Sequence, residues 1–254
     1  DSSSVSSNLS SDVTEIFSTN QAFAALKSDG SVITWGDSID GGDSSSVSSN
    51  LSSDVTEIFS TGYAFAALKS DGSVITWGYS SQGGDSSSVS SDLSSGVTEI
   101  FSTRYAFAAL KSDGSVVTWG SSYYGGDSSS VSSDLSSDVT KIFSTDFSFA
   151  ALKSDGSVIT WGDSGFGGDS SSVSSNLSSD VTEIFSTTRA FAALKSDGSV
   201  ITWGDSIDGG DSSSVSSNLS SDVTEIFSTT RAFAALKSDG SVITWGDSID
   251  GGDS

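Results

Sequence analysis

Short apolar and polar runs follow one another along this chain in a fixed order. Residues 13–19 are β-branched and aromatic, residues 22–27 form a second apolar run, and residues 31–36 form a third. Each run has the length and composition of a β-strand, and no window shows the 3.6-residue period of a helix. Asp29-Gly30 stands between the last two runs and predicts a two-residue hairpin turn with positive φ.

A fourth run at residues 44–49 is rich in serine and less clearly patterned. We interpret it as an outer strand, with Val47 and Leu51 facing inward. The pattern therefore predicts an all-β chain built from four-stranded antiparallel units.

The four runs return every 42 residues, which is the signature of a repeat architecture. The copies are residues 1–42, 43–84, 85–126, 127–168, 169–210 and 211–252. Copies five and six are identical, which indicates recent amplification or design. Four strands per repeat predict a six-bladed β-propeller that occupies residues 1–254 as a single domain. A solenoid with two rungs per copy is the alternative, but it needs atypical capping repeats, and the terminal copies are not atypical.

The first and last copies suggest how such a ring would close. The chain begins with an outer-strand segment at residues 1–9, and it ends just after the third strand of copy six. Pairing residues 2–8 with residues 241–246 would complete the last blade and cover a sheet edge. This predicts termini that are adjacent in space.

Charge and composition narrow the classes of partner. The chain carries 33 acidic and 10 basic residues, for a net charge of −23. Nucleic acids and anionic membranes are therefore poor partners, because binding them relies on Lys and Arg. Cysteine and histidine are both absent, so we expect no disulfide, no thiolate or imidazole chemistry, no metal and no cofactor. The compartment stays open, with a soluble cytoplasmic protein slightly favoured.

The string Ala25-Leu26-Lys27-Ser28-Asp29-Gly30-Ser31-Val32-Ile33-Thr34-Trp35-Gly36 recurs in every copy. It resembles the repeats of the regulator of chromosome condensation family, and the resemblance implies a β-propeller. Members of that family usually have seven blades and longer repeats. Their nucleotide-exchange activity on a small GTPase depends on insertions without a counterpart here, and their chromatin binding conflicts with the acidity of this chain. The resemblance thus implies the fold, and an exchange factor is a remote alternative.

Differences between copies concentrate in two windows, one before the second strand and one after the Trp-Gly pair. In an up-and-down sheet both windows fall at the same end of the strands, opposite the constant Asp-Gly turns. Tyr and Arg are frequent interface anchors. We therefore predict a binding face for a protein, or less favourably a glycan, formed by Tyr63, Tyr79, Arg104, Tyr105, Tyr123, Tyr124, Phe147, Phe166, Arg189 and Arg231.

Other interpretations of these windows stay open. Drift in tolerant loops would also produce differences, and the chain would then be a structural or engineered repeat scaffold without its own ligand. We expect a monomer, with a strand-swapped oligomer as the alternative.

Two further groups of residues suggest chemistry but favour a structural role. The six tryptophans could line a carbohydrate site, yet their invariance favours packing inside every repeat. The carboxylates of Asp37, Asp40 and Asp43 are possible calcium ligands, but their spacing matches no calcium loop, and copies two and three lack the first two. Since no single copy holds a distinct acid and base, we expect no enzymatic activity.

Overall fold

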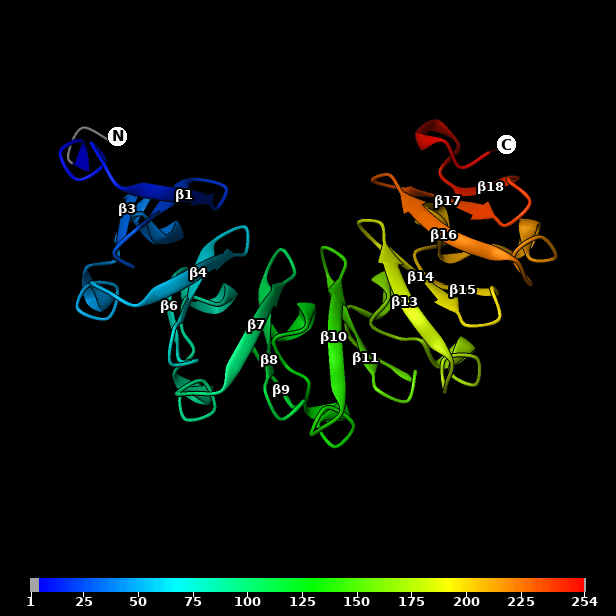
Figure 1. Cartoon of the computed structure of the whole chain (residues 1–254), viewed down its shortest axis with the longest axis horizontal. Coiled ribbons are helices and arrows are strands. Elements are labelled where there is room, and N and C mark those ends of the chain that lie inside the picture. The colour runs from blue at the N-terminus through cyan, green and yellow to red at the C-terminus, as the bar shows by residue number, and fades with distance from the viewer. Residues whose placement is uncertain (1–4, 254) are drawn as a thin grey trace. The chain divides into compact units, whose positions relative to one another are not determined.

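The computed structural model describes residues 5–253, and within that range the chain forms six three-stranded antiparallel sheets (Figure 1). Each sheet contains the strands of one repeat in sequence order. The strands are β1 (Val13–Ser18), β2 (Ala22–Lys27), β3 (Val32–Gly36), β4 (Val55–Ser60), β5 (Ala64–Lys69), β6 (Val74–Gly78), β7 (Val97–Ser102), β8 (Ala106–Lys111), β9 (Val116–Gly120), β10 (Val139–Ser144), β11 (Ser148–Lys153), β12 (Val158–Gly162), β13 (Val181–Ser186), β14 (Ala190–Lys195), β15 (Val200–Gly204), β16 (Val223–Ser228), β17 (Ala232–Lys237) and β18 (Val242–Gly246). The all-β prediction is confirmed.

Short helical turns follow the third strand of each repeat. They are η2 (Ser38–Gly42), η3 (Ser45–Val47), η4 (Ser80–Gln82), η5 (Ser87–Val89), η6 (Ser122–Tyr124), η7 (Ser129–Val131), η8 (Ser164–Phe166), η9 (Ser171–Val173), η10 (Ser206–Gly210), η11 (Ser213–Val215) and η12 (Ser248–Asp250). Contacts divide the chain into unit 1, residues 1–127, and unit 2, residues 128–254, with three repeats in each. No helix of the described residues is long and apolar enough to cross a membrane.

The predicted fourth strand is wrong, because each sheet formed by residues 5–253 contains three strands. The segment after β3 folds into η3 and further turns, and its serine and aspartate side chains explain why. Asp43 Oδ1 accepts a hydrogen bond from Ser45 N at 2.9 Å, and Ser48 Oγ donates to Ser45 O at 3.0 Å. Such local side-chain to backbone bonds compete with strand pairing.

The turn segment still covers the outer edge of the sheet at one point. Leu51 is buried, and its carbonyl accepts a hydrogen bond from Val32 N of β3 at 2.9 Å. Leu51 therefore faces inward as predicted, although it does so from a turn rather than from a strand.

The predicted two-residue hairpin between β2 and β3 is also wrong. Lys27 N donates to Ser31 O, and Gly30 N donates to Lys27 O, both at 2.9 Å, so the loop has three residues. Only Gly30 has positive φ, at 76°. This is a tight turn followed by a left-handed glycine. The Asp29 carboxylate accepts hydrogen bonds from the Ser31 hydroxyl at 2.6 Å and the Ser31 amide at 3.0 Å, and these bonds lower the pKa of Asp29.

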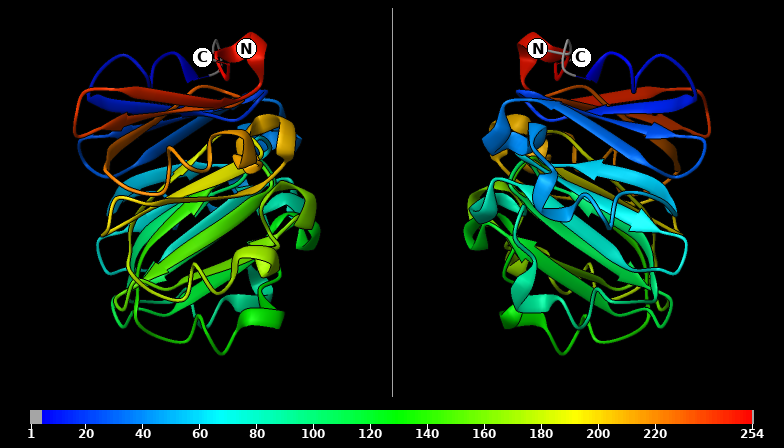
Figure 2. Two further views of the ribbon diagram at one scale, coloured as in Figure 1. Left: turned by 90° about the vertical axis from the view of Figure 1, so that its right-hand side faces the viewer. Right: turned by 90° about the vertical axis from the view of Figure 1, so that its left-hand side faces the viewer.

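Neighbouring sheets inside each unit pack face to face, and Figure 2 shows these stacked sheets from the side. Ala22 and Ala24 of β2 are buried against Phe65 and Trp77 of the following repeat. The small alanines leave room for the aromatic pair, whose rings stack with centroids 5.1 Å apart. A sheet with a neighbour on each side, such as that of repeat 2, is therefore apolar on both faces.

The tryptophan side chains also tie one repeat to the next. Trp77 Nε1 donates a hydrogen bond to Gly41 O of the preceding repeat at 3.0 Å. A Cβ on Gly41 would lie 2.6 Å from the Phe65 ring, so only glycine fits this contact. Core positions for the tryptophans are confirmed in five repeats, and in repeat 1 Trp35 is half-buried.

The predicted pairing of residues 2–8 with residues 241–246 falls partly outside the described residues, as do Asp1 and Ser254, so the proximity of the termini stays a prediction. The described part of the first segment forms a turn, in which Leu9 N donates to Val5 O at 3.1 Å. Between residues 5 and 253, β18 has β17 as its neighbour in the sheet and no fourth strand beside it.

Candidate binding surface

Each repeat has two chemically different ends. In repeat 1, residues 19–21 and 37–42 meet at the loop end, and the hairpin loop 28–30 lies at the opposite turn end. Asp37 N donates to Gln21 O at 2.9 Å, and Thr19 Oγ1 donates to Asp40 O at 3.1 Å. Equivalent backbone bonds recur in every other repeat, so the two variable windows lie side by side as predicted.

A line of backbone hydrogen bonds joins the loop ends of neighbouring repeats. In unit 1, Asn20 N donates to Gly62 O, and Gly62 N donates to Arg104 O, both at 2.9 Å. In unit 2, Asp146 N donates to Thr188 O, and Thr188 N donates to Thr230 O, both at 3.0 Å. Because these bonds use backbone atoms only, the side chains at the same positions are free to differ between repeats.

In unit 1 the predicted tyrosines form a cluster, here called the tyrosine cluster, of Tyr63, Tyr105, Tyr123 and Tyr124. The Tyr63 and Tyr105 rings stack at 5.8 Å, Tyr105 and Tyr124 lie 4.5 Å apart, and Tyr123 meets Tyr124 edge-on at 5.1 Å. The Arg104 guanidinium lies 5.7 Å from the Tyr105 ring centroid. Tyr63 and Tyr105 come from different repeats, so the cluster crosses a repeat junction.

Two of the predicted tyrosines face solvent. Tyr123 is 64% exposed and Tyr79 is 41% exposed. Tyr79 N donates to Tyr63 O at 3.0 Å, which places Tyr79 beside the tyrosine cluster through its backbone. Unit 1 therefore presents two exposed tyrosine side chains, of which Tyr123 packs against the partly buried Tyr124.

In unit 2 the predicted residues form a second group at the junction of repeats 4 and 5. The Phe147 and Phe166 rings lie 4.9 Å apart. The Arg189 guanidinium of the following repeat lies 5.1 Å from the Phe166 centroid and 5.9 Å from the Phe147 centroid. A guanidinium over an aromatic face is a favourable contact.

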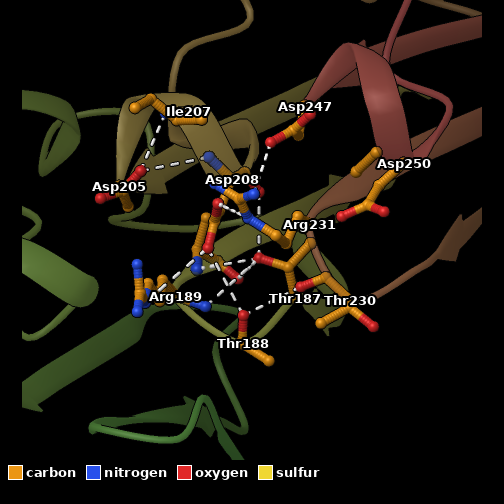
Figure 3. Close-up of polar contacts among 12 residues, drawn as sticks. Thr187, Thr188, Arg189, Asp205, Ile207, Asp208, Thr230, Arg231, Asp247 and Asp250 are labelled. Carbon is orange, nitrogen blue, oxygen red and sulfur yellow. Dashed lines mark hydrogen bonds and ion pairs between the residues drawn. The ribbon is translucent and has the colours of Figure 1, made fainter.

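The junction of repeats 5 and 6 is built around the buried carboxylate of Asp208 (Figure 3). Arg231 Nε donates to Asp208 Oδ1 at 2.8 Å, and Arg231 Nη1 lies 2.7 Å from Asp247 Oδ2. Arg189 Nε lies 3.9 Å from Asp208 Oδ2, and Thr188 Oγ1 donates to the same oxygen at 3.4 Å. The hydrogen bond to Asp208 raises the pKa of Arg231.

The second window of copies one, five and six places Asp40, Asp208 and Asp247 at this end of the repeats, but the sequence analysis did not predict that Asp208 pairs with Arg231. A usable signal was nevertheless present: the second-window aspartate of copy five is followed, in copy six, by an arginine in the first window. Comparing windows across the junction of neighbouring copies, rather than within one copy, would have paired Asp208 with Arg231.

Two shallow grooves lie in unit 2, beside third strands and the turns that follow them. One, of about 350 Å³, is lined by residues around η9 and η11, by Thr202 and Trp203, and by Ser164 and Gly210 at the loop ends. The other, of about 330 Å³, is lined by residues around η7 and by Val158, Ile159 and Thr160. Among residues 5–253, no group of three or more acidic side chains is arranged to hold a metal ion.

Comparison with known proteins supports the fold. No family model matches the sequence, and no curated protein matches it. Prp20p from Saccharomyces cerevisiae matches with a TM-score of 0.50 and 15% identity, over 92% of this chain and 72% of that protein. The CRINKLY WD40 ectodomain of the Arabidopsis thaliana receptor kinase ACR4 matches with a TM-score of 0.50 and 17% identity, over 92% and 85% of the two chains.

Human WBSCR16 matches with a TM-score of 0.48 and 18% identity, over 77% of this chain, which spans 62% of that protein. The similarities to Prp20p and the ACR4 ectodomain show a repeat fold of the β-propeller type.

Proposed function

We propose that this chain is a non-enzymatic recognition module that binds a protein partner through the loop ends of its repeats. The observation that carries the proposal is Tyr123, which is 64% exposed and packs edge-on against Tyr124 at 5.1 Å. An exposed aromatic ring held by its neighbour loses little side-chain entropy on binding, and tyrosine is a frequent anchor at interfaces.

Two other considerations support a protein partner. Prp20p is described by its binding to Gsp1p and histones, so a fold of this type is compatible with protein recognition. The net charge of −23 disfavours nucleic acid. The absence of cysteine and histidine from the sequence, and the lack of a distinct acid and base pair in any one repeat, support a function without catalysis.

We further propose that the repeats are of the regulator of chromosome condensation type and that six of them close into one ring. The string at residues 25–36 supports the first point. The exposed apolar residues at the two ends of the array support the second. They are Ile16 and Phe23 in repeat 1, and Phe227 and Val242 in repeat 6. Light scattering on the purified chain tests one consequence of closure. If the ends cover each other within one chain, a mass of 25.8 kDa is expected, and a multiple of it would indicate that they are covered by exchange between chains.

A capture experiment tests the binding face. The immobilised chain is exposed to extract of its native host, beside Tyr79→Ser and Tyr123→Ser variants. Ile207→Ser is the matched control, because Ile207 occupies the position of Tyr123 in another repeat and is similarly exposed, at 60%. We expect the tyrosine variants to lose the protein that the wild type and the control both capture. Equal capture by all variants would contradict the proposal, and binding of a glycan array but no protein would favour the glycan alternative.

A further inference from the structure

The loop end of repeat 1 contains a buried carboxylate that lacks a counter-charge. Asp40 is only 6% exposed, and its Oδ2 has no hydrogen-bond partner among residues 5–253. Burial, and after it the charge of Asp37, raises the pKa of Asp40. Folded proteins rarely leave a buried charge or polar group unpaired, because desolvation without compensation costs free energy.

Repeat 5 has the same sequence in this segment, and there the carboxylate is paired. Arg231 Nε donates to Asp208 Oδ1 at 2.8 Å. The local frames of the two repeats match, since Asp37 Oδ1 accepts from Asp40 N at 3.2 Å and Asp205 Oδ1 accepts from Asp208 N at 3.2 Å. The two carboxylates are therefore presented in the same way.

The two junctions differ in the residue that the next repeat supplies. Repeat 6 supplies Arg231, whereas repeat 2 supplies Tyr63 at the corresponding position. The following repeat docks equally in both cases, because Trp77 Nε1 donates to Gly41 O at 3.0 Å and the corresponding bond of repeat 6 also measures 3.0 Å. The position that the guanidinium takes at one junction thus lacks a cation at the other.

That position also communicates with solvent. The side chain of Arg231 is 37% exposed while it contacts the buried Asp208, so a guanidinium at this place reaches a buried carboxylate from outside. At the first junction, the neighbouring Gln21 and Ile39 are exposed. A cationic side chain from another molecule would therefore have a path to Asp40.

We propose that Asp40 is a binding site for a guanidinium group supplied by a partner, as an arginine side chain of a protein ligand. The inference rests on the proposed recognition function and names the chemistry of one contact within it. Guanidinium matches carboxylates through several donors and stacks on aromatic rings. Tyr63, in the place of Arg231, offers such a ring.

Titration of the whole chain with N-acetyl-arginine methylamide tests the site, with binding followed by NMR. The neutral isostere N-acetyl-citrulline methylamide and the corresponding lysine compound are the comparison ligands. We expect saturable binding of the arginine compound, no binding of citrulline, and weaker binding of lysine. An affinity for citrulline equal to that for arginine would overturn the inference, because the carboxylate would not be the recognised group.

Three variants locate the binding. Asp40→Asn should weaken it at least about ten-fold, as expected for the loss of a charge-assisted hydrogen bond. Tyr63→Arg should also abolish it, because the guanidinium is then supplied within the chain. Asp208→Asn is the matched control and should bind as the wild type does, since Asp208 is occupied by Arg231. Unchanged affinity in Asp40→Asn, with the fold verified by thermal unfolding, would overturn the site.

The outcome is separable from that of the proposed function. A partner captured through Tyr123 that is insensitive to Asp40→Asn would remove this inference and leave the recognition function standing. Arginine binding at Asp40 without any partner that depends on Tyr123 would remove the proposed protein-binding face and leave the guanidinium site standing.

Discussion

The turn end and the loop end of each repeat contact the neighbouring repeat by different means. At the turn end, Val55 N donates to Gly30 O at 3.1 Å, and a Cβ on Gly30 would lie only 2.6 Å from Asp54 N. This contact uses backbone atoms, and its glycine is the same in every copy. At the loop end, hydrogen bonds from the tryptophan side chains and the backbone join the repeats and recur along the chain, whereas the side chains of the two variable windows change from repeat to repeat.

The difference explains why variation is concentrated at the loop end. The turn end offers no space for a side chain, so a substitution there disturbs the junction itself. At the loop end, the tryptophan and backbone hydrogen bonds that join the repeats do not involve the variable side chains. A Tyr, Phe or Arg at a variable position therefore leaves those hydrogen bonds intact. Function can therefore change at the loop end without a change of fold.

Removing a tryptophan that joins two repeats at the loop end should lower the free energy of unfolding most. Trp77→Ala removes a buried ring and its hydrogen bond to Gly41 O, and the expected loss in the free energy of unfolding is about 3–5 kcal/mol. Trp35→Ala is the matched control and should lose less, because Trp35 is half-buried. Urea unfolding measures both, and equal losses would contradict the role assigned to the junction bond.

A substitution at the turn end should rank second. Gly30 and Gly240 both have positive φ, 76° and 84°, but a Cβ on Gly240 has no neighbour within 4 Å. Alanine at either position costs about 1–2 kcal/mol for the left-handed conformation. Gly30→Ala should lose about 1–3 kcal/mol more, because Asp54 must move. If both variants unfold at the same urea concentration, the close contact between Gly30 and Asp54 does not contribute to stability.

Substituting a variable side chain at the loop end should lower the free energy of unfolding less, and the loss should be larger where a buried charge is left unpaired. Arg231→Met removes the partner of Asp208, and we expect a loss of about 1–3 kcal/mol. The loss stays below that of a fully buried pair, because the Arg231 side chain is 37% exposed. Arg104→Met, which loses only the contact with Tyr105, should cost about 0.5–1 kcal/mol. Chemical denaturation ranks the two, and the reverse order would contradict the assignment.

The smallest effect concerns the pH dependence of stability. The pKa of Asp40 is raised in the folded chain, so its unfavourable contribution is absent below the ordinary value of about 3.8. It develops as pH rises from this value to the raised pKa of the folded chain, and it is fully present above that pKa. Asp40→Asn should therefore be more stable than the wild type at neutral pH, by up to about 1 kcal/mol, and the gain should vanish in acid. Thermal unfolding across this pH range measures it, and a gain that persists in acid would rule out titration of Asp40.

Residues with lowered pKa values set the background for that measurement. The hydrogen bonds from Ser31 lower the pKa of Asp29, and equivalent bonds act in the other repeats. Their stabilising contribution is present above the ordinary pKa and is lost as pH falls through the lowered one. Because wild type and Asp40→Asn share these residues, only the difference between the two proteins reports on Asp40.

The strands were predictable from the sequence because β-branched and aromatic residues mark them directly. The outer segment was not, since Val47 and Leu51 suit either a strand or a turn, and the decision lies in hydrogen bonds such as Asp43 to Ser45. The three-residue length of the hairpin loop was not predicted for the same reason, because Asp29-Gly30 is compatible with more than one loop length.

The candidate surface was predictable in position but not in its contacts. The period of 42 residues placed both windows at one end. It did not show that Tyr63 stacks on Tyr105 of the next repeat, or that Asp208 pairs with Arg231. The structure also explains two differences between copies that lie outside the two windows, at Gly96 and Ser148. Gly96 has φ 78°, where the corresponding Asp54 has φ 67°, and Ser148 Oγ donates to Phe166 O at 2.6 Å.

The backbone hydrogen bonds that join the loop ends of neighbouring repeats link each donor to an acceptor one period away. Asn20 bonds to Gly62, and Gly62 bonds to Arg104, always 42 positions on. Deleting or duplicating a whole repeat would therefore leave each remaining backbone donor with an equivalent acceptor. Unequal recombination between copies could change the number of repeats without a new core having to evolve, and the identical copies five and six are what such an event would leave behind.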